Sequence, residues 1–264
     1  MCAQDGIAPQ QTSDSFPSFS LDSWEAFKDF VSRDLLAKDL PADNSLRPRY
    51  LFRGHRDETW ALEPKFDRIF KSLPGVDRAD THELLLENFR KECRNFPEYR
   101  EEVGQPMRCL ALAQHHGLPT RLLDWTESPY IAAYFAFHAH LSMDHGDNDS
   151  GKDKKVAIWI LDRKAKHYWS GDRGVELVDP MSWSNERCKR QLGWFTFART
   201  PFRNLQEYVL QLGNEKHALR KVTMSAGLAE LALKDLELMR ISARDLFPDL
   251  TGAAVNAFIR SVLT

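Results

Sequence analysis

The chain has 264 residues, of which 42% are hydrophobic and 11% are aromatic, and its formal net charge at pH 7 is -2. This length and composition are those of a folded globular protein that buries one large core, so a disordered or collagen-like chain is excluded. A net charge this close to zero also excludes a strong overall attraction to nucleic acid or to acidic membranes, although a local basic patch is compatible with it.

The cysteines and the apolar runs restrict the protein class further. The four cysteines are far apart and form no C-x-x-C pair, so neither a zinc ribbon nor a redox motif is indicated. The first twenty residues lack a basic region followed by an apolar run, and no segment approaches the roughly 18 apolar residues that a membrane span needs. We expect a cytoplasmic protein with reduced thiols and no membrane partner.

The first part of the chain predicts a tail and then a helix. Residues 1–20 are rich in Gln, Ser, Asp and Pro, which predicts a mobile tail that precedes one domain over residues 21–264. The spacing of Trp24, Phe27 and Val31 predicts an amphipathic helix that ends before Pro41.

A strand and two helices are predicted next. The strand Arg49-Tyr50-Leu51-Phe52 ends on Arg53-Gly54-His55. This arrangement is a common way to hold a guanidinium over a cleft, and it is equally a common way to end a strand. Apolar spacing then predicts helices over residues 81–96 and 106–114, the second of which ends at Gly117.

The stretch over residues 114–129 concentrates polar and titratable side chains within a turn-rich segment. It leads into a helix with a clear beginning, because Ser128 is a good N-cap and Pro129 suits the first helical position. The N-terminus of a helix offers free N–H groups and partial positive charge, which suit an anion such as a pyrophosphate. We therefore expect function to depend on this stretch.

The second half of the chain predicts two strong strands, over residues 156–161 and 193–199, and a further strand within residues 215–224. Residues 169–183 are predicted to be irregular, and residues 226–264 to be helical with a break at Phe247-Pro248-Asp249. This order favours a single mixed α+β domain over regular βαβ units. His138, His140 and His145 lack a carboxylate or cysteine at a suitable spacing, so no metal site is expected.

Several motifs together resemble the FRG domain family, named for its Phe-Arg-Gly signature. The resemblance rests on Leu51-Phe52-Arg53-Gly54-His55 with Trp60, and on the segment from Gln114 to Thr126 with Ser128-Pro129. Weaker matches follow at Arg187, Gln191, Gly193, Phe195-Thr196 and Leu246-Phe247-Pro248-Asp249-Leu250. The family is poorly characterised and often lies in bacterial and phage gene neighbourhoods, so its name alone implies no activity.

A second resemblance, to ADP-ribosyltransferases, implies a chemistry. In those enzymes a strand ends in Arg, a polar Ser/Thr segment leads into a helix, and a later strand carries Glu or Gln. This likeness implies a small split β-sheet core surrounded by helices, with NAD bound across the split as a substrate. Carried over, Arg53 would hold NAD, Thr126 and Ser128 would brace it, and Gln191 would take the last position. Glu186 would take that position in a different register.

The resemblance gives a set of expected site residues. The expected catalytic residues are Arg53, His116, Thr126 and Gln191, with either His115 or His116 orienting a ligand or moving a proton. The expected NAD-binding residues are Arg53, Gly54, His55, Arg121, Asp124, Trp125, Thr126, Ser128 and Tyr134. Gln cannot act as a general base, which suits a nucleophile that needs little activation, such as a nucleobase nitrogen.

Structural roles are an alternative for the same residues. Arg121 and Asp124 would form a buried salt bridge, Trp125 would lie in the core, and the two adjacent histidines would cap a helix.

Three functions stay open. The first is an NAD-using ADP-ribosyltransferase-like toxin or phage-defence effector, with a nucleic-acid or protein acceptor and an antitoxin or other regulatory partner. The second is a nucleotide- or nucleic-acid-binding or processing protein in which Arg53, Arg121 and Arg187 contact phosphates. The third is a non-catalytic interaction module.

Overall fold

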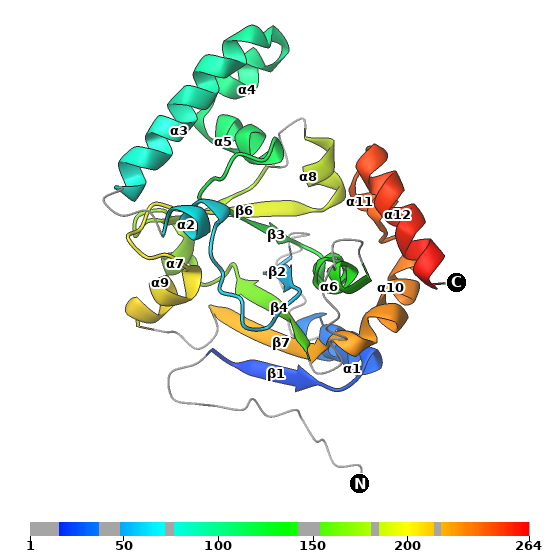
Figure 1. Ribbon diagram of the computed structural model, residues 1–264. Helices are drawn as coiled ribbons and strands as arrows, with labels where there is room; N and C mark the ends of the chain where they lie inside the picture. The colour runs from blue at the N-terminus through cyan, green and yellow to red at the C-terminus, as the bar shows by residue number, and fades with distance from the viewer. Residues whose placement is uncertain are drawn as a thin grey trace.

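The computed structural model describes residues 16–36, 48–71, 77–141, 154–180, 185–213 and 218–263. Within these ranges one mixed sheet forms the centre of the molecule, in the strand order β1-β7-β4-β2-β3-β6-β5 (Figure 1). Among the strands that the structure describes, only β1 and β7 pair in parallel. The strands are β1 (Ser18–Leu21), β2 (Tyr50–His55), β3 (Leu122–Thr126), β4 (Lys155–Asp162), β5 (Val175–Val178), β6 (Gly193–Ala198) and β7 (Leu219–Ser225).

Helices cover both faces of the sheet. Those before β4 are α1 (Trp24–Phe30, continued as a π-helix over Val31–Leu36), α2 (Lys65–Phe70), α3 (Arg78–Glu92), α4 (Arg100–Gly104), α5 (Pro106–His115) and α6 (Pro129–Phe137). Those after it are α7 (Lys166–Trp169), α8 (Glu186–Arg190), α9 (Leu205–Gln211), α10 (Ala229–Leu238), α11 (Ala243–Leu246) and α12 (Leu250–Leu263). No helix in these described ranges combines the length and apolar character that crossing a membrane requires.

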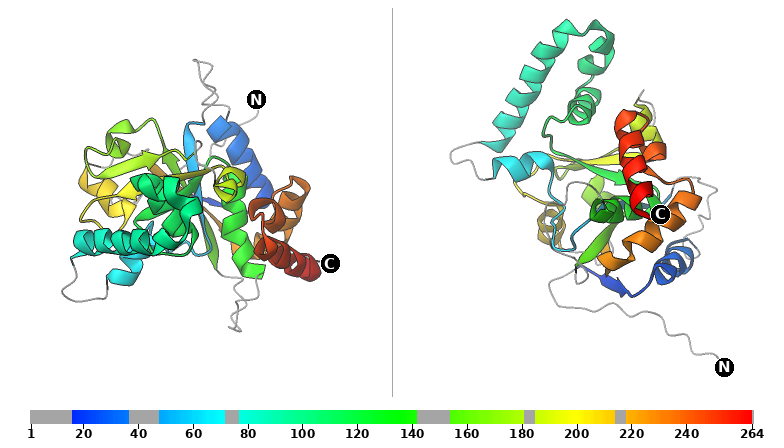
Figure 2. Two further views of the ribbon diagram at one scale, coloured as in Figure 1. Left: turned by 90° about the horizontal axis from the view of Figure 1, so that it is seen from above. Right: turned by 45° about the vertical axis from the view of Figure 1, so that its right-hand side comes forward.

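Three groups of buried apolar side chains hold these layers together. The first lies between the sheet and helices α1, α6 and α10, and the second lies on the opposite face with α7 and α9. The third joins β3, β5 and β6 to α3 and α5. Helices α3 to α5 form an arm that projects from the body of the molecule (Figure 2), so the third group attaches this arm to the sheet.

The sheet diverges between β2 and β3. These two strands pair only at Phe52 and Thr126, whereas β2 pairs with β4 from Tyr50 to His55. Helix α6 lies directly against β2 at this point, because a Cβ atom on Gly54 would come within 1.9 Å of the Ala132 main-chain oxygen. The glycine therefore allows the alanine-rich helix to approach the strand beside the divergence.

The expected single α+β domain is confirmed, but the sheet is larger than the small sheet that was predicted. Its seven described strands include β5, which lies within the segment predicted to be irregular. The predicted tail over residues 1–20 ends too late, since Ser18–Leu21 pair with β7 and bury Leu21. Residues 1–15 and His145 lie outside the described residues.

The predicted helix starts are largely confirmed. Ser128 is the N-cap of α6, where its hydroxyl accepts a hydrogen bond from the Ile131 N–H at 3.2 Å, and Pro129 is the first residue. The helix predicted over residues 81–96 begins earlier, because Asp77 caps α3 at the N–H groups of Ala79 and Asp80.

Candidate functional site

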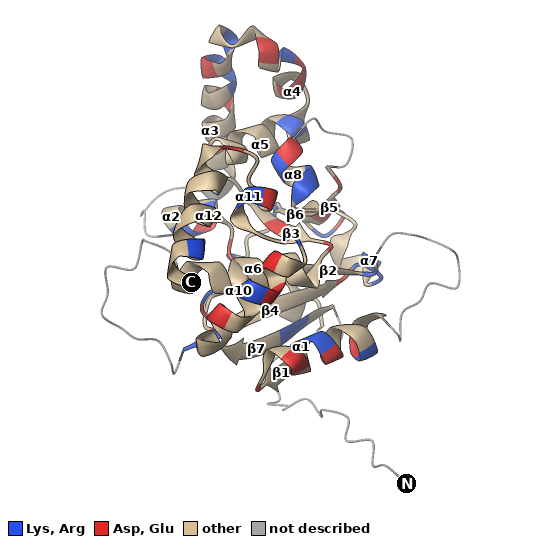
Figure 3. Ribbon diagram, turned by 90° about the vertical axis from the view of Figure 1, so that its right-hand side faces the viewer, with Lys and Arg blue, Asp and Glu red and all other residues tan. Residues whose placement is uncertain are grey.

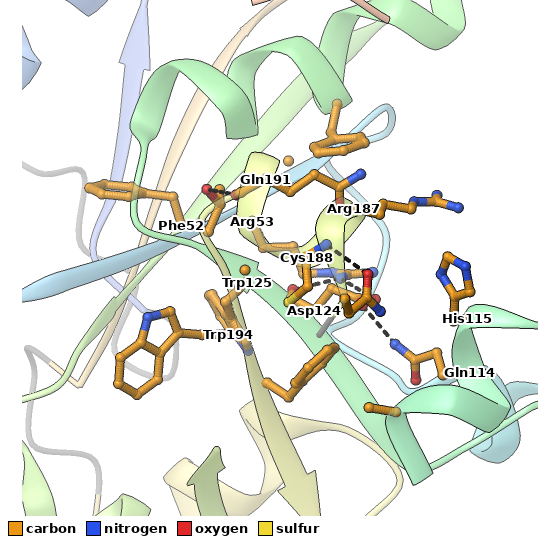
Figure 4. A pocket seen from close by; sticks show the side chains of 17 residues that line it. Phe52, Arg53, Gln114, His115, Asp124, Trp125, Arg187, Cys188, Gln191 and Trp194 are labelled. Atoms are coloured by element: carbon orange, nitrogen blue, oxygen red, sulfur yellow. Dashed lines mark hydrogen bonds and ion pairs between the residues drawn. The ribbon is translucent and has the colours of Figure 1, made fainter. Parts of the chain in front are cut away.

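A cavity of about 390 Å³ lies at the divergence between β2 and β3 (Figure 4). Arg53 within β2, Thr126 at the end of β3 and Gln191 after α8 all line it, although β2 continues through His55 and does not end at Arg53 as predicted. The other polar lining residues are Gln114, His115, Asp124, Asn185, Arg187 and Cys188, and the apolar ones include Phe52, Phe135, Trp194 and Phe195. The cavity thus combines segments that are far apart in the chain.

Arg53 occupies the divergence itself. Its Nη1 donates a hydrogen bond to the main-chain oxygen of Asp124 at 2.7 Å, and its Nε donates to Nε2 of His55 at 3.0 Å. The guanidinium therefore pairs a carbonyl on β3 at the point where the two strands separate. Burial lowers the pKa of Arg53, and the nearby Asp124 carboxylate opposes this shift. An arginine with its usual pKa above about 12 remains protonated in such a site.

His55 supports Arg53 from behind and does not line the cavity. Because Nε2 accepts the hydrogen bond from Arg53, the neutral ring carries its proton on Nδ1. Burial, followed by the positive charge of Arg53, lowers the pKa of His55 to about 3. His55 therefore lies outside the cavity and contacts the arginine that lines it.

Asp124 brings negative charge to the cavity. Its side chain is 61% exposed, and its Oδ2 lies 3.6 Å from Nη1 of Arg53. The Nε2 atom of Gln114 donates a hydrogen bond to Asp124 Oδ1 at 2.6 Å, and the Gln114 Oε1 atom accepts one from the Thr120 hydroxyl. Among the described lining residues, Asp124 is the only acidic one. The network fixes this carboxylate next to the guanidinium.

A hydrogen bond from a side chain to the main chain connects Thr126 with Gln191. The Thr126 hydroxyl donates to the main-chain oxygen of Gln191 at 2.7 Å and accepts a hydrogen bond from the Ser128 N–H at 3.2 Å. The Gln191 Nε2 atom donates to the Leu246 oxygen at 3.2 Å. These bonds position the end of α8 over the cavity and use the amide nitrogen of Gln191. In the described residues they leave its Oε1 atom as an acceptor for a ligand.

Besides His55, four expected site residues do not line the cavity: Arg121, Ser128, Tyr134 and His116. Arg121 is buried and donates to the Thr200 oxygen at 2.6 Å, with Asp67 at 3.5 Å, so it stabilises the core. Its carboxylate partner is Asp67, so the predicted alternative of an Arg121–Asp124 salt bridge is also wrong. Ser128 caps α6.

The other two lie in the core and at the end of a helix. Tyr134 is 2% exposed, belongs to the core, and stacks on His138 with ring centroids 5.0 Å apart. His116 is exposed at the C-cap of α5 and contacts Tyr99 edge-on, which leaves His115 as the histidine that lines the cavity.

Trp125 lies in the core, as the structural alternative predicted, and Glu186 lies outside the cavity. Side chains alternate along a strand, so Trp125 faces away from Asp124. Its indole is 3% exposed, lies in the core beside Trp194 and donates to the Thr196 hydroxyl at 3.1 Å. Trp125 touches the cavity, but its ring offers no stacking face to a ligand. Glu186 pairs with Lys189 at 3.0 Å and does not line the cavity, which disfavours the alternative register.

Two residues near α8 were not assigned to the site from the sequence. Asn185 is the N-cap of α8, where its side chain accepts from the Cys188 N–H. The Cys188 thiol is buried, and burial together with the nearby Asp124 raises its pKa to about 12, so it is no nucleophile at neutral pH. Asn185 was recognisable only as a helix cap, and no pattern in the sequence marked Cys188 as a site residue.

Basic residues lie on α8 (Figure 3). Arg187 lines the cavity, and its Cζ atom lies 4.5 Å from the centre of the Phe247 ring. His115 lies on the α5 side, and burial, then His116 and Arg187, lower its pKa, so its imidazole is mainly neutral at pH 7. In the described ranges no group of three or more His, Cys, Asp or Glu side chains is arranged to hold a metal ion.

The comparisons with known proteins bear on the segments that form one half of this cavity. No curated protein and no solved structure matches the chain. A family model described as the FRG domain matches residues 48–145, which include β2, β3 and all of α6. The match therefore contains Arg53, Gln114 and Asp124 and ends before α8. Over residues 48–145 the chain is similar to the FRG domain family.

Proposed function

We propose that the cavity binds NAD and that the protein is an ADP-ribosyltransferase-like enzyme that acts as a toxin or phage-defence effector. The observation that supports this proposal is the convergence of Arg53, Asp124 and Gln191 on one cavity where a sheet diverges. Its volume of about 390 Å³ lies within the range of about 300–1,000 Å³ that is usual for ligand sites.

The residues that line the cavity include groups that can bind the phosphates and the riboses of a dinucleotide. Arg53 uses Nη1 and Nε for internal bonds, and its remaining N–H groups are donors for a phosphate. Arg187 adds a second positive charge. The Gln191 Oε1 atom and the Asp124 carboxylate accept hydrogen bonds from ribose hydroxyls. These two hydrogen-bond acceptors then lie near C1′ of the ribose. Their partial or full negative charge stabilises the positive charge that develops on the sugar.

The proposed reaction breaks the bond between C1′ of the ribose and the nicotinamide nitrogen. The electron pair leaves with nicotinamide, and positive charge develops on the sugar as in other glycosidic cleavages. A lone pair on the acceptor forms the new bond to C1′, and the acceptor then loses its proton. The neutral imidazole of His115 lines the cavity and takes this proton.

Incubation of the purified protein with NAD tests the proposal. We expect release of nicotinamide, which Arg53→Lys reduces strongly and the exposed control Arg203→Lys leaves unchanged. Single-stranded DNA, RNA and protein are supplied in turn as acceptors, and transfer is detected as a mass increase of one ADP-ribose. Failure to release nicotinamide with every acceptor would refute the enzymatic proposal.

Nucleotide binding without transfer is the second candidate. The observation in its favour is that the Thr126 hydroxyl and the Gln191 amide nitrogen are used in internal bonds, while Asp124 is the only acidic lining residue described. This candidate predicts that ADP-ribose binds with an affinity that falls steeply with salt, while NAD stays intact. If the cavity binds neither NAD nor ADP-ribose, the non-catalytic interaction module is the function that remains.

The proposed biological role has its own test. Expression of an NAD-consuming enzyme in the bacterial cytoplasm is expected to slow growth, and Arg53→Lys is expected to relieve this effect. A regulatory partner that restrains the protein would restore growth when both are expressed. Equal growth of cells that express either form at the same level would contradict the toxin proposal.

A further inference from the structure

A second cavity, of about 150 Å³, lies next to the first. Arg53, Gln114 and Asp124 line both cavities, so their hydrogen-bonded network forms the shared wall. The charged residues that complete the second cavity are Glu63, Lys65 and Arg68.

Three positive side chains, Arg53, Lys65 and Arg68, and two carboxylates, Asp124 and Glu63, line this second cavity, which leaves an excess of positive charge. Asp124 lies 3.6 Å from Arg53, so the positive charge that it does not offset is on α2. Lys65 and Arg68 are three residues apart on α2, so they share one face of that helix, and both are exposed. The Lys65 Nζ atom donates to the Gly117 oxygen at 3.0 Å. Glu63 does not balance Arg68, because Lys71 lies 3.3 Å from its carboxylate.

The arrangement places two guanidinium groups near each other. No hydrogen bond or ion pair of the Arg68 guanidinium is found within the described residues, and the charge of Arg68 contributes to lowering the pKa of Arg53 and of His55. Like charges that face one cavity repel each other, and a bound anion between them relieves this repulsion. A phosphate group has the charge and the acceptor oxygens that two arginines and a lysine satisfy.

We propose that the second cavity is a phosphate-binding site formed by Arg53, Lys65 and Arg68. The identity of the molecule that carries the phosphate rests on the proposed function. It is either the pyrophosphate of NAD, which would then extend across the Arg53 wall, or a phosphate of the molecule that accepts ADP-ribose. The site itself does not require that any transfer takes place.

Titration with inorganic pyrophosphate at low ionic strength tests the site without NAD. The double variant Lys65→Ala/Arg68→Ala is expected to bind pyrophosphate about tenfold more weakly or worse, because it loses two positive charges. The variant Lys65→Arg/Arg68→Lys keeps both positive charges and is expected to bind pyrophosphate about as tightly as the wild type does. The control Arg33→Ala/Lys166→Ala removes two exposed positive charges that line no described cavity and is expected to bind as the wild type does.

Equal pyrophosphate binding by the wild type and by Lys65→Ala/Arg68→Ala would overturn the site, as would an equal loss in the control pair. A second measurement identifies the carrier. If NAD supplies the phosphate, the double variant raises the KM for NAD about tenfold. If the acceptor supplies it, that KM is unchanged and a short single-stranded oligonucleotide binds about tenfold more weakly. Pyrophosphate binding with no nicotinamide release would refute the proposed enzyme and retain the site.

Discussion

Arg53 has two tasks at the divergence of the sheet, and they are separable by substitution. It holds the Asp124 carbonyl on β3 and presents its remaining donors to the cavity. Arg53→Lys keeps the charge but loses the planar fork, so we expect release of nicotinamide from NAD to fall by about 10- to 100-fold. The free energy of unfolding is expected to fall by only about 1–3 kcal/mol, through lost hydrogen bonds. Kinetics and urea unfolding of the same preparation measure the two effects.

A loss of stability much larger than this, with activity retained in the folded fraction, would assign Arg53 to the fold alone. The variant His55→Gln provides the comparison, because His55 contacts Arg53 but not the cavity. It is expected to disturb the orientation of the arginine and therefore to raise the KM for NAD while the protein stays folded.

His115 predicts a pH dependence of the proposed reaction. Its imidazole accepts a proton only when neutral, and burial lowers its pKa below 6.5. The rate should therefore reach a plateau at neutral and alkaline pH and fall as the pH decreases through the lowered pKa. His115→Gln is expected to lower the rate at pH 7.5 about 100-fold and to abolish this inflection.

His116→Gln is the matched control for that measurement, since it alters the adjacent ring but no residue that lines the cavity. It is expected to keep the inflection. An inflection that survives in His115→Gln would show that another group takes the proton.

At the scale of single residues, the motifs indicated where the site lies more reliably than what each side chain does there. Arg53 of β2, the segment from Gln114 and the later glutamine do converge on one cavity. The roles of Arg121 and Asp124 depend on strand alternation, which places them on opposite faces of the extended chain and gives them different partners. The sequence alone does not show the register of β3. It therefore does not show which of these two side chains enters the core and which enters the cavity.

At the scale of elements, the contact of α6 with β2 is the closest packing beside the site. A Cβ atom at Gly54 would lie 1.9 Å from the Ala132 oxygen and 2.7 Å from the Ala136 nitrogen, both main-chain atoms of α6. Gly54→Ala must therefore shift the helix, and we expect it to lower the free energy of unfolding by about 3–5 kcal/mol. Chemical denaturation monitored by circular dichroism measures this change.

Gly193→Ala offers a comparison at the other side of the cavity. There the nearest atom to the new Cβ is the Cys188 sulfur at 2.6 Å, a side-chain atom that can rotate away. We expect a smaller loss, about 1–2 kcal/mol, which the additional substitution Cys188→Ala reduces. Equal losses for the two alanine variants would contradict the idea that main-chain proximity sets the cost.

The elements themselves were predictable to different degrees. Helix α6 was found from its first two residues because Ser128 and Pro129 both act locally. Strands β1 and β5 are four residues long and lie at the edges of the sheet, where pairing with β7 and β6 defines them. Such short strands have no periodicity that separates them from loops.

At the scale of the whole molecule, two buried histidines are expected to make the fold sensitive to acid. Burial and the charge of Arg53 lower the pKa of His55 to about 3, and burial and Arg121 lower that of His82 to about 4. In the unfolded chain a histidine titrates near 6.5. Between pH 6.5 and these lowered values the unfolded chain therefore binds more protons, so stability is complete above pH 6.5 and is lost as the pH falls.

His82 connects this effect to the projecting arm. It lies on α3 and packs edge-on against Phe66 of α2, with ring centroids 5.2 Å apart, and near Phe197 of β6 at 6.0 Å. A proton on this ring places a charge in the apolar contact that attaches the arm to the body. Because α5 of the same arm carries Gln114 and His115 to the cavity, acid should loosen the cavity wall together with the arm.

His82→Gln tests this coupling. The difference in the free energy of unfolding between pH 7 and pH 4.5 is expected to decrease by about 2–3 kcal/mol, because the variant has no proton to take up there. Unfolding at pH 8 measures the loss of packing separately, since the histidine is neutral in both states at that pH. Hydrogen exchange at pH 5 should show faster opening of α3 and α5 than of β4 in the wild type and a smaller contrast in the variant. An unchanged pH dependence in His82→Gln would show that the acid sensitivity comes from other groups, and that the arm opens independently of His82.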